Sequence, residues 1–436
     1  MRNFTFKGLF LTAVFMLLGC LSIQAADDDL ITKQITIKLE EAGTLPNKIG
    51  SNRKYQITNL KLVGEINGTD WKMIREMAGS DYRGDKTDGN LSVLDLSEAK
   101  IVEGGDYYYY YSYYNDTYYT SNDKIGDYAF YNCSRLTSLT LPAGITSIGE
   151  GAFWHCSGLT SLNLPAGITE IGSFAFSGCS GLTSLTLPAG ITSIGDYAFS
   201  RCSGLTSLNL PAGITTIGYA AFSGCSGLTS LTLPAGITEI YGSAFKNCTG
   251  LTSLNLPAGI TSIGGGAFYG CSRLKEVRFC INDNLDTYLT KGHPYIDVDC
   301  GIKYYINDKE ITSIVIPSSV TSLGNYAFQK CSTLQSVYVS WSTPISAGKA
   351  FDEFDTSKCT LYVPQGTEQD YWLAVIWCDF GNIVEYDATG IEKTTTSTDV
   401  KEVSRYSVNG QRLVGPTKGL NIVKYSDGSV KKVAVE

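Results

Sequence analysis

Apolar positions recur every 23 residues through the middle of the chain, over residues 136–274. The first unit reads LTSLTLPAGITSIGEGAFWHCSG, the second reads LTSLNLPAGITEIGSFAFSGCSG, and further units follow in the same register. Leu139 and Leu141 alternate with Ser138 and Thr140, which is the pattern of a strand with one buried and one exposed face. A fixed period of this length predicts a solenoid, in which each unit forms one coil and the coils stack.

The rest of each unit indicates how the coil closes. Pro142 and Gly144 are typical of a turn that leads the chain out of the strand, and Ile145 and Ile148 form a second inward pair. Three apolar residues then follow at helical spacing, at Ala152, Phe153 and Cys156. The sequence therefore predicts an α/β solenoid of 23-residue coils, with a parallel sheet on one face and short helical or 3-10 turns on the other.

The pattern continues in diverged form beyond the near-identical units and sets the predicted domain boundaries. The solenoid is expected to span residues 33–386, with atypical ends that act as caps. Two insertions interrupt it, a tyrosine-rich one at 103–124 and a second one at 279–305. A polar, threonine-rich linker at 387–402 then leads to a small β-rich tail at 403–436.

The repeat carries a family resemblance. The strings LTSLTLPAGITSIG and GAFxxCSxL closely resemble the BspA-like leucine-rich repeats of bacterial surface proteins, over most of residues 90–340. The strings LEEAGTLPNKIG and LVGEINGTDWKMIREMAG also look like the amino-terminal region of such proteins in the Bacteroidetes. The resemblance implies a leucine-rich repeat array in an exported protein that is displayed at the cell surface. It also implies adhesion to host matrix proteins or to other bacteria, without identifying the ligand.

The tail has a resemblance of its own. YSVNGQRL, GLNIVKYSDG and KKVAVE look like the carboxy-terminal sorting domains of the type IX secretion route in the same phylum. The pairs Asn409-Gly410 and Asp427-Gly428 are hairpin turn signals, which predict short antiparallel strands. A sorting domain and a small β module without a sorting role both fit this pattern.

The first residues resemble an export signal. Arg2 and Lys7 precede an apolar run at 9–18, and small residues follow, so we predict a signal peptide at 1–25. Cys20 in the string LLGC leaves a lipid anchor as the alternative. Later apolar runs are too short to span a bilayer, so no transmembrane helix is expected in the mature chain. We therefore expect an exported protein at the cell surface, at the outer membrane or in the extracellular space.

Charge argues against one class of partner. The chain has a net charge of -8 and only two histidines, and its lysines and arginines form no basic stripe. Binding to a phosphate backbone requires such a stripe, so the sequence predicts no nucleic-acid partner.

Cysteines follow the Ala-Phe pair once in every coil, at Cys133, Cys156, Cys179, Cys202, Cys225, Cys248, Cys271 and Cys331. Stacked coils place such residues about 5 Å apart, which is too far for disulfides, so we predict a ladder of buried free thiols. Paired CxxC motifs are absent, and the sequence predicts neither a metal site nor a cofactor. Cys280 and Cys300 flank the second insertion, so a disulfide between them that pins this loop is a candidate beside two free thiols.

Catalytic residues are hard to assign, so we expect a protein that is not an enzyme. His155 occupies a position that is taken by Asn132, Gly178 and Arg201 in sister coils, which indicates a variable outer residue. His293 lies between Cys280 and Cys300, so a hydrolase sited in the 279–305 insertion remains as a distant alternative.

Two surfaces are candidates for binding. The first is made of two outward rows on the sheet, Ser138, Ser161, Ser184, Ser207, Ser230 and Ser253 beside Thr140, Asn163, Thr186, Asn209, Thr232 and Asn255. The second is the tyrosine-rich insertion, with Tyr107, Tyr108, Tyr109, Tyr110, Tyr111, Tyr113, Tyr114, Tyr118 and Tyr119. Repeated hydroxyls and amides can bind a glycan or an extended peptide by multivalency, and tyrosines suit adaptable contact loops.

Our hypothesis is that rows and insertion together form one adhesive surface for a host matrix protein, a mucin or other glycan, or a bacterial surface partner. Four alternatives stay open. Ser and Thr also suit any exposed strand, and the insertion can be a lid over the early coils. The whole array can be a structural spacer without its own ligand, and regular threonine rows can also bind ice.

Overall fold

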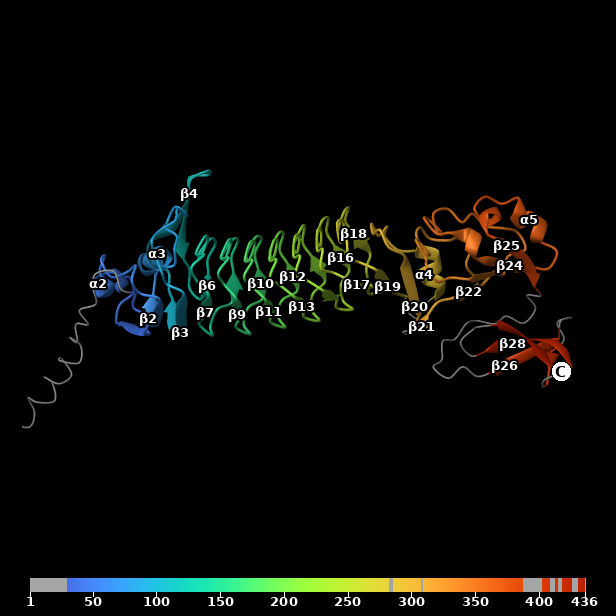
Figure 1. The fold of residues 1–436 in the computed structure, drawn as a ribbon, viewed down its shortest axis with the longest axis horizontal. Coiled ribbons are helices and arrows are strands. Elements are labelled where there is room, and N and C mark those ends of the chain that lie inside the picture. The colour runs from blue at the N-terminus through green and yellow to red at the C-terminus, as the bar shows by residue number, and fades with distance from the viewer. Residues whose placement is uncertain are drawn as a thin grey trace, which may run out of the picture.

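The computed structural model describes residues 30–281, 285–306, 309–386, 402–407, 412–414, 418–425 and 430–435. The coils stack side by side into an elongated array between two less regular ends (Figure 1). The predicted signal peptide at 1–25 and nearly all of the predicted linker at 387–402 lie outside the described residues.

One long sheet runs along the array. Within the described residues it has twelve strands, in the order β1-β2-β3-β7-β9-β11-β13-β15-β17-β19-β20-β21, and only the last pairing is antiparallel. The first strands are β1 (Ile35–Leu39), β2 (Asn59–Ile66) and β3 (Val93–Ile101). The repeats supply β7 (Ser138–Thr140), β9 (Ser161–Asn163), β11 (Ser184–Thr186), β13 (Ser207–Asn209), β15 (Ser230–Thr232) and β17 (Ser253–Leu256). The last strands are β19 (Glu276–Ile281), β20 (Ile302–Ile306) and β21 (Lys309–Glu310).

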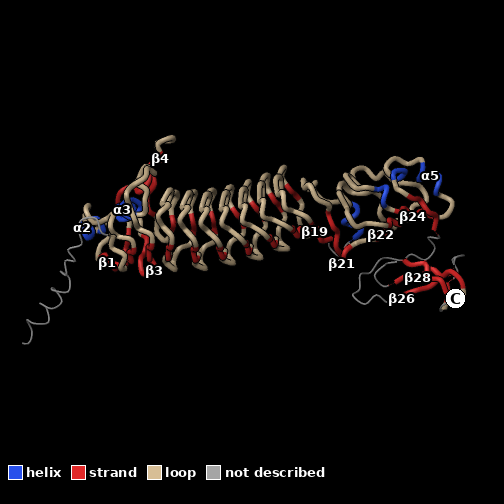
Figure 2. The backbone as a smooth tube through the Cα atoms, in the orientation of Figure 1, coloured by secondary structure: helices blue, strands red, loops and turns tan. Residues whose placement is uncertain are grey.

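Each coil also carries a second, two-residue strand, and we call these the lateral strands. They are β6 (Lys124–Ile125), β8 (Ser147–Ile148), β10 (Glu170–Ile171), β12 (Ser193–Ile194), β14 (Thr216–Ile217), β16 (Glu239–Ile240) and β18 (Ser262–Ile263). In the described chain they form two separate ladders, β10-β8-β6 and β12-β14-β16-β18. Turns and loops make up most of each coil between the two kinds of strand (Figure 2).

The predicted solenoid of stacked 23-residue coils is confirmed. Leu139 pairs in register with Leu162, so equivalent residues of neighbouring coils become neighbours in space. The central leucine of each repeat strand is buried while the residues on either side of it are exposed, as the alternation predicted.

The far side of the coil differs in detail from the predicted helical or 3-10 turn. Successive hydrogen bonds of the i to i-3 type do occur, for example from the amide of Cys156 to the oxygen of Phe153. However, residues with positive φ interrupt them twice in a typical coil, as at Gly151 (φ 55°) and His155 (φ 61°). A helix needs consecutive right-handed residues, so the chain forms a series of turns instead.

The position of His155 therefore requires a left-handed residue in every coil. Gly178 and Gly224 meet this requirement without strain, whereas Arg201 adopts it with φ 60°. The sequence comparison of coils detected this site only as a variable one.

Replacing Arg201 by glycine is expected to raise the free energy of unfolding by about 0.5–1 kcal/mol. The left-handed conformation costs a residue with a Cβ roughly 1–2 kcal/mol, and the greater freedom of unfolded glycine offsets part of that gain. Chemical denaturation measures the difference. The matched control is Gly224→Ala, where an added Cβ would lie 3.5 Å from the Arg201 side chain, so strain alone should lower the stability. Equal stability of both variants and the parent would contradict this explanation.

Two ladders fill the core of the array. The rings of Phe130, Phe153, Phe176, Phe199, Phe222, Phe245 and Phe268 stack with centroids 5.1–5.5 Å apart. The cysteine ladder lies beside them, and the six thiols from Cys156 to Cys271 each donate a hydrogen bond to a phenylalanine carbonyl of the preceding coil, as from Cys202 to Phe176 at 3.1 Å. The ladder of buried free thiols is confirmed, except that Cys271 is half-buried.

The amino-terminal end contains two helices, α2 (Leu45–Ile49) and α3 (Gly68–Met77). Helix α3 starts with a capping box, in which Asn67 accepts from the amide of Thr69 and Asp70 accepts from the amide of Asn67. Asp70 is buried and also accepts the amides of Gly43 and Leu45, so one carboxylate joins the starts of both helices. The tyrosine-rich insertion forms a hairpin of β4 (Gly104–Tyr111) and β5 (Asp116–Thr120).

The carboxy-terminal end starts after the insertion that carries α4 (Leu285–Lys291). In the part of this end that is described, a parallel sheet contains β22 (Ser313–Ile316), β23 (Ser336–Val339), β24 (Thr360–Pro364) and β25 (Asn382–Tyr386). Around it lie η1 (Thr356–Lys358), α5 (Glu368–Trp372) and η2 (Trp377–Asp379).

The predicted β-rich tail is confirmed as an antiparallel sheet. Its described strands are β26 (Glu402–Ser407), β27 (Arg412–Leu413), β28 (Gly419–Tyr425) and β29 (Val430–Val435). A sorting role for this tail stays a prediction.

Candidate functional site

The two sheet-face rows predicted from the sequence lie on the exposed face of the long sheet. Ser138 pairs with Ser161 and Thr140 pairs with Asn163, and the same register continues through β17. The six repeat strands of the long sheet, β7, β9, β11, β13, β15 and β17, all expose these residues. The rows therefore form two parallel lines of hydroxyl and amide groups along six coils.

A third line of side chains, the threonines at the position of Thr137 in each coil, was not singled out in the sequence analysis. Its hydroxyls have a structural role, which those of the sheet-face rows lack. Thr160 donates its hydroxyl hydrogen bond to the oxygen of Thr137 at 3.1 Å, and Thr183 donates to the oxygen of Thr160 at 3.3 Å. Thr206, Thr229 and Thr252 repeat this contact. In the described structure, the side chains of the sheet-face rows form no such hydrogen bond with the protein. Their donors and acceptors are available to a ligand.

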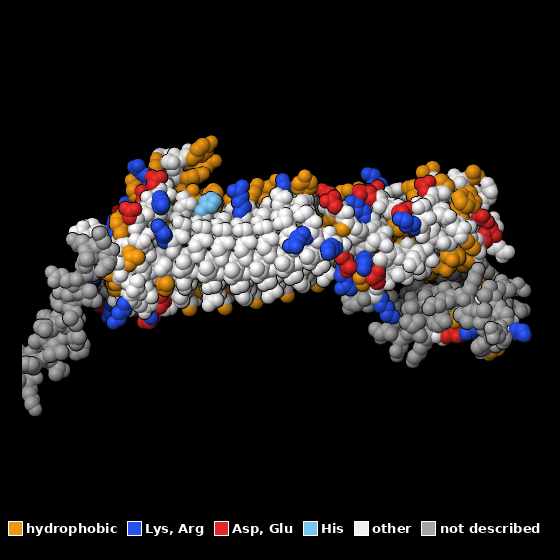
Figure 3. Space-filling view, viewed as in Figure 1, with side chains coloured by type: hydrophobic (Ala, Val, Ile, Leu, Met, Phe, Trp, Pro, Cys, Tyr) orange, Lys and Arg blue, Asp and Glu red, His pale blue; other side chains and the backbone are white. Residues whose placement is uncertain are grey.

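Charged groups bound this uncharged face at both ends. At the amino-terminal end, Lys61 pairs with Glu98 at 2.6 Å and with Asp95 at 3.6 Å. In the view of Figure 3, charged side chains gather toward the two ends of the array and are sparse over its middle.

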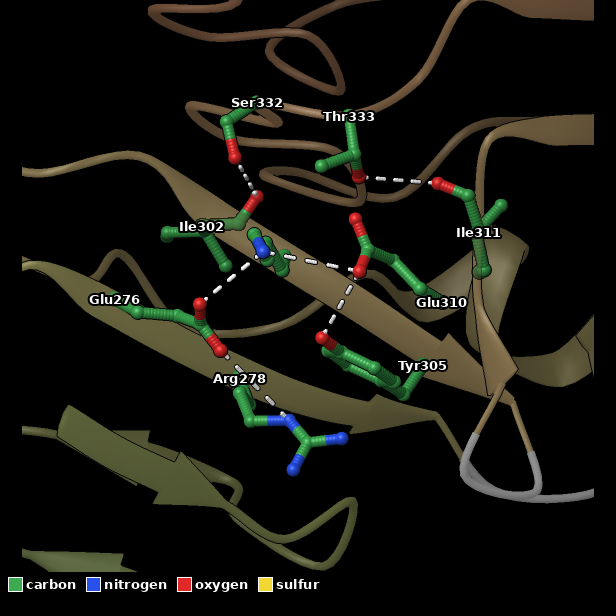
Figure 4. Close-up of polar contacts among 9 residues, drawn as sticks. Glu276, Arg278, Ile302, Tyr305, Glu310, Ile311, Ser332 and Thr333 are labelled. Atoms are coloured by element: carbon green, nitrogen blue, oxygen red, sulfur yellow. Dashed lines mark hydrogen bonds and ion pairs between the residues drawn. The ribbon is translucent and has the colours of Figure 1, made fainter.

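The opposite end carries a larger cluster, on β19, β20 and β21 (Figure 4). Lys303 lies 3.1 Å from Glu276 and 3.7 Å from Glu310, and the hydrogen bond to Glu276 raises the pKa of Lys303. The hydroxyl of Tyr305 donates to Glu310 at 3.2 Å, and the guanidinium of Arg278 lies 4.0 Å from the centre of the Tyr305 ring. Ion pairs this exposed add little stability, so their main effect is to end the neutral face.

The tyrosine hairpin divides into a buried base and an exposed tip. Tyr108 and Tyr109 are 1% and 3% exposed, and the Tyr108 hydroxyl donates to the oxygen of Asp127 at 2.8 Å. Burial raises the pKa of both phenols. Tyr113, Tyr114 and Tyr119 are 79%, 67% and 53% exposed. The buried base fits the lid alternative, and the contact role of the exposed tip stays a prediction. Among the nine predicted tyrosines, Tyr107, Tyr110, Tyr111 and Tyr118 are half-buried.

The hairpin and the sheet-face rows form separate surfaces. Tyr118 and Tyr119 line a depression together with residues of β6, β8 and β10, which are lateral strands. The depression contains no residue of the sheet-face rows. The single adhesive surface of the sequence hypothesis is thus two surfaces in the structure.

The candidate disulfide between Cys280 and Cys300 is contradicted, because Cys300 is a free thiol. In the β19–β20 pairing Cys280 lies opposite Tyr305, whereas Cys300 precedes Tyr305 by five residues. This offset corresponds to on the order of 15 Å along a strand, and a disulfide needs Cα atoms within about 7 Å.

Among the ladder thiols, burial raises the pKa of Cys202 to about 12, so these groups remain protonated and unreactive.

The histidines do not form a catalytic pair with cysteine in the described structure. The ring nitrogens of His293 contact the oxygen of Pro294 at 2.8 Å and the hydroxyl of Tyr304 at 2.9 Å. The ring stacks on Phe279 at 4.4 Å, and burial lowers the pKa of His293 to about 4. His155 holds the left-handed turn position described above. No group of three or more metal-ligating side chains occurs among the described residues.

Within the described ranges, none of the helices is both long and apolar enough to cross a membrane.

Comparison with known proteins gives one family match and several structural ones. The family described as BspA type leucine rich repeat region matches in six copies, over residues 104–211, 169–291 and 301–369. A leucine-rich repeat protein from Bacteroides ovatus is 26% identical over 63% of this chain and 67% of its own, with a TM-score of 0.38. A leucine-rich repeat protein from T. pallidum is 29% identical over 36% of this chain and 76% of its own, with a TM-score of 0.32. A leucine rich cell surface protein from Faecalibacterium prausnitzii is 22% identical over 66% of this chain and 86% of its own, with a TM-score of 0.35. Comparison with curated proteins gives no match.

Proposed function

Because its repeats match the family over more than half of its length, the chain belongs to the BspA type leucine-rich repeat proteins, and from this premise we propose that it is an adhesive protein of the cell surface. Its partner is a host matrix protein, a mucin or other glycan, or a bacterial surface component. The sheet-face rows are the contact surface. The display of another leucine-rich repeat protein, that of Faecalibacterium prausnitzii, at a cell surface is consistent with this location.

The observation that carries the proposal is the difference between neighbouring hydroxyl lines. The line of Thr137 and Thr160 uses its hydroxyls to join coils, but the sheet-face rows leave theirs to solvent. The alternative is that small polar residues simply suit exposed strand positions, in which case the unbonded hydroxyls of the rows would have no function. An in-register lattice of donors and acceptors, repeating about every 4.8 Å, instead suits a long polar partner. Weak contacts repeated along six coils then add up by multivalency.

The test places charge on the face without disturbing the core. A triple variant changes three residues of one row to lysine, Thr186→Lys, Asn209→Lys and Thr232→Lys. Each position is exposed, so the fold should tolerate the change. Full-length parent and variant are compared on arrays of matrix proteins, mucins and glycans, and in adhesion to partner cells. We expect the variant to lose binding by at least about tenfold, because several adjacent contacts fail together.

The matched control adds the same charge to the same coils on another surface. It changes the exposed turn residues of these coils, Ala189→Lys, Ala212→Lys and Ala235→Lys. Retained binding in the control and lost binding in the row variant support the proposal. Equal binding by both variants and the parent would show that the rows are not the contact surface. A parent that binds nothing, and that tolerates removal of a two-coil unit in cells, would identify the array as a spacer.

A further inference from the structure

A groove lies between the hairpin and the lateral strands, apart from the sheet-face rows. Its volume is about 590 Å³, which is within the usual size of small-ligand sites. Tyr118 and Tyr119 come from the hairpin, and the opposite side is made of β6, β8 and β10 with the turns that follow them. Figure 1 shows the hairpin standing out from the array next to these first coils.

The floor of the groove is open backbone. Gly149, Gly172 and Gly195 succeed one another along it. Neighbouring coils approach so closely here that a Cβ on Gly172 would lie 2.7 Å from the carbonyl carbon of Gly149. Glycine is therefore required by packing, and as a result no side chain fills the floor.

The polar groups of the groove are unevenly charged. Its lining includes two carboxylates, Asp127 and Glu170, one lysine, Lys124, and serines such as Ser147 and Ser173. One oxygen of Asp127 accepts the amide of Glu150 at 2.8 Å. Glu170 and Lys124 are exposed, and neither forms an ion pair in the described part of the chain. The lining thus offers carboxylates and hydroxyls as hydrogen-bonding groups, with a slight excess of negative charge.

The lateral ladder is also interrupted at this groove. The strands β6, β8 and β10 form one ladder and β12 starts another, so the pairing breaks between Glu170–Ile171 and Ser193–Ile194. Ser193 and Gly195, on the far side of the break, line the groove. Among the lateral strands of the near-identical repeats, which are all described, this is the only break.

We propose that this groove binds a short neutral oligosaccharide, with one sugar ring on the face of Tyr119 and its hydroxyls bonded to Glu170 and Asp127. The inference rests on the proposed adhesive function and assigns it a second, separate subsite. A sugar ring has an apolar C–H face and a polar edge, which matches an aromatic wall beside carboxylates and hydroxyls.

The charge and the lining select this ligand over two others. A sialylated or sulfated glycan would bring negative charge next to Asp127 and Glu170, which is unfavourable. An apolar peptide would need apolar pockets for its side chains, but apart from three isoleucines the residues opposite the tyrosines are polar or glycine. A basic peptide fits the charge but would not need the Tyr119 face or the open floor.

The test uses the full chain and measures binding of maltotriose, cellotriose, chitotriose and mannotriose by calorimetry, with sialyllactose and a basic peptide as comparison probes. We expect at least one neutral trisaccharide to bind. Tyr119→Ala and Glu170→Gln should each weaken this binding about tenfold, because the first removes the aromatic wall and the second replaces a charged hydrogen-bond acceptor by a neutral amide. The matched controls are Tyr269→Ala, an exposed tyrosine outside the groove, and Glu239→Gln, the residue at the same phase of a later coil. The controls should leave the affinity unchanged.

The outcomes separate this inference from the adhesive function. Tighter binding of sialyllactose or of the basic peptide, or equal effects in variants and controls, would overturn the saccharide groove. No trisaccharide binding by the parent, together with adhesion that the sheet-face lysine variant abolishes, would also overturn the groove but leave the adhesive function standing. Loss of both would reject both.

Discussion

Phe199→Ala should lower the free energy of unfolding by about 3–5 kcal/mol, the largest single effect that we expect in the repeat array. Phe199 is fully buried and stacks on Phe176 and Phe222, with both centroid distances at 5.2 Å. Truncation removes a large apolar surface from the core and interrupts the stack on both sides. Identical coils above and below cannot close the gap without losing their own register. Denaturation followed by circular dichroism measures the loss.

The control for this prediction lies in the same coil. Tyr197 stacks on Phe174 with centroids 4.6 Å apart, but on the outside of the coil, where it is only half-buried. Tyr197→Ala should cost roughly 1 kcal/mol or less, because the pairing is partly solvated already. If both substitutions cost the same, the phenylalanine stack would have no special role in holding the coils together.

Arg75→Met should destabilise the amino-terminal end by about 3 kcal/mol or more. Arg75 is completely buried, and its guanidinium donates to the oxygens of Tyr128 at 2.6 Å and Ala129 at 3.0 Å. It also donates to the oxygens of Asp81 and Tyr131 and lies 5.0 Å from the centre of the Tyr109 ring. One side chain thus joins α3, the hairpin and the first coil. Methionine keeps much of the volume but leaves several buried carbonyl groups without this donor.

Hydrogen exchange gives a readout that separates this joint from a general loss of stability. In Arg75→Met, amides of the hairpin and of residues 124–136 should exchange faster, while amides of the central repeats should keep their protection. Arg83→Ala is the control, because Arg83 is an exposed arginine that contacts a tyrosine ring at the surface, that of Tyr82. Exchange that rises uniformly along the chain, or that is equal in both variants, would contradict a local joint.

The sequence predicted the repeat because the determinants of a coil are local and recur. Leu139, Ile148 and Phe153 point inward for reasons that any single unit contains, and stacking then follows from the period. The turns were predicted less well. Left-handed residues at Gly151 and His155 could have been detected by noting that Gly and Asn recur at the His155 position.

Features that depend on contacts between distant residues could not be predicted from the sequence pattern. A run of five tyrosines gives no alternation, so nothing local indicates that Tyr108 and Tyr109 are buried while Tyr113 is exposed. Their burial depends on Arg75 and on the first coil. The Cys280–Cys300 candidate failed for a similar reason, because flanking an insertion does not fix the strand register. The sequence correctly placed the sheet-face rows on the exposed face of the sheet. Only the structure shows that the threonine hydroxyls beside them are used in hydrogen bonds between coils, whereas those of the rows are not.

The ladder thiols and the threonine hydroxyls that join the coils donate toward the preceding coil, whereas Ser200 donates to Ser223 of the following one. Cys202 donates to Phe176 and Thr183 donates to Thr160, in each case toward the preceding coil. A coil emerging behind a folded one therefore meets every acceptor that its thiol and this hydroxyl require. We therefore expect that the rod can assemble in the order of synthesis, because each completed turn already presents the acceptors for the thiol and the threonine hydroxyl of the next one.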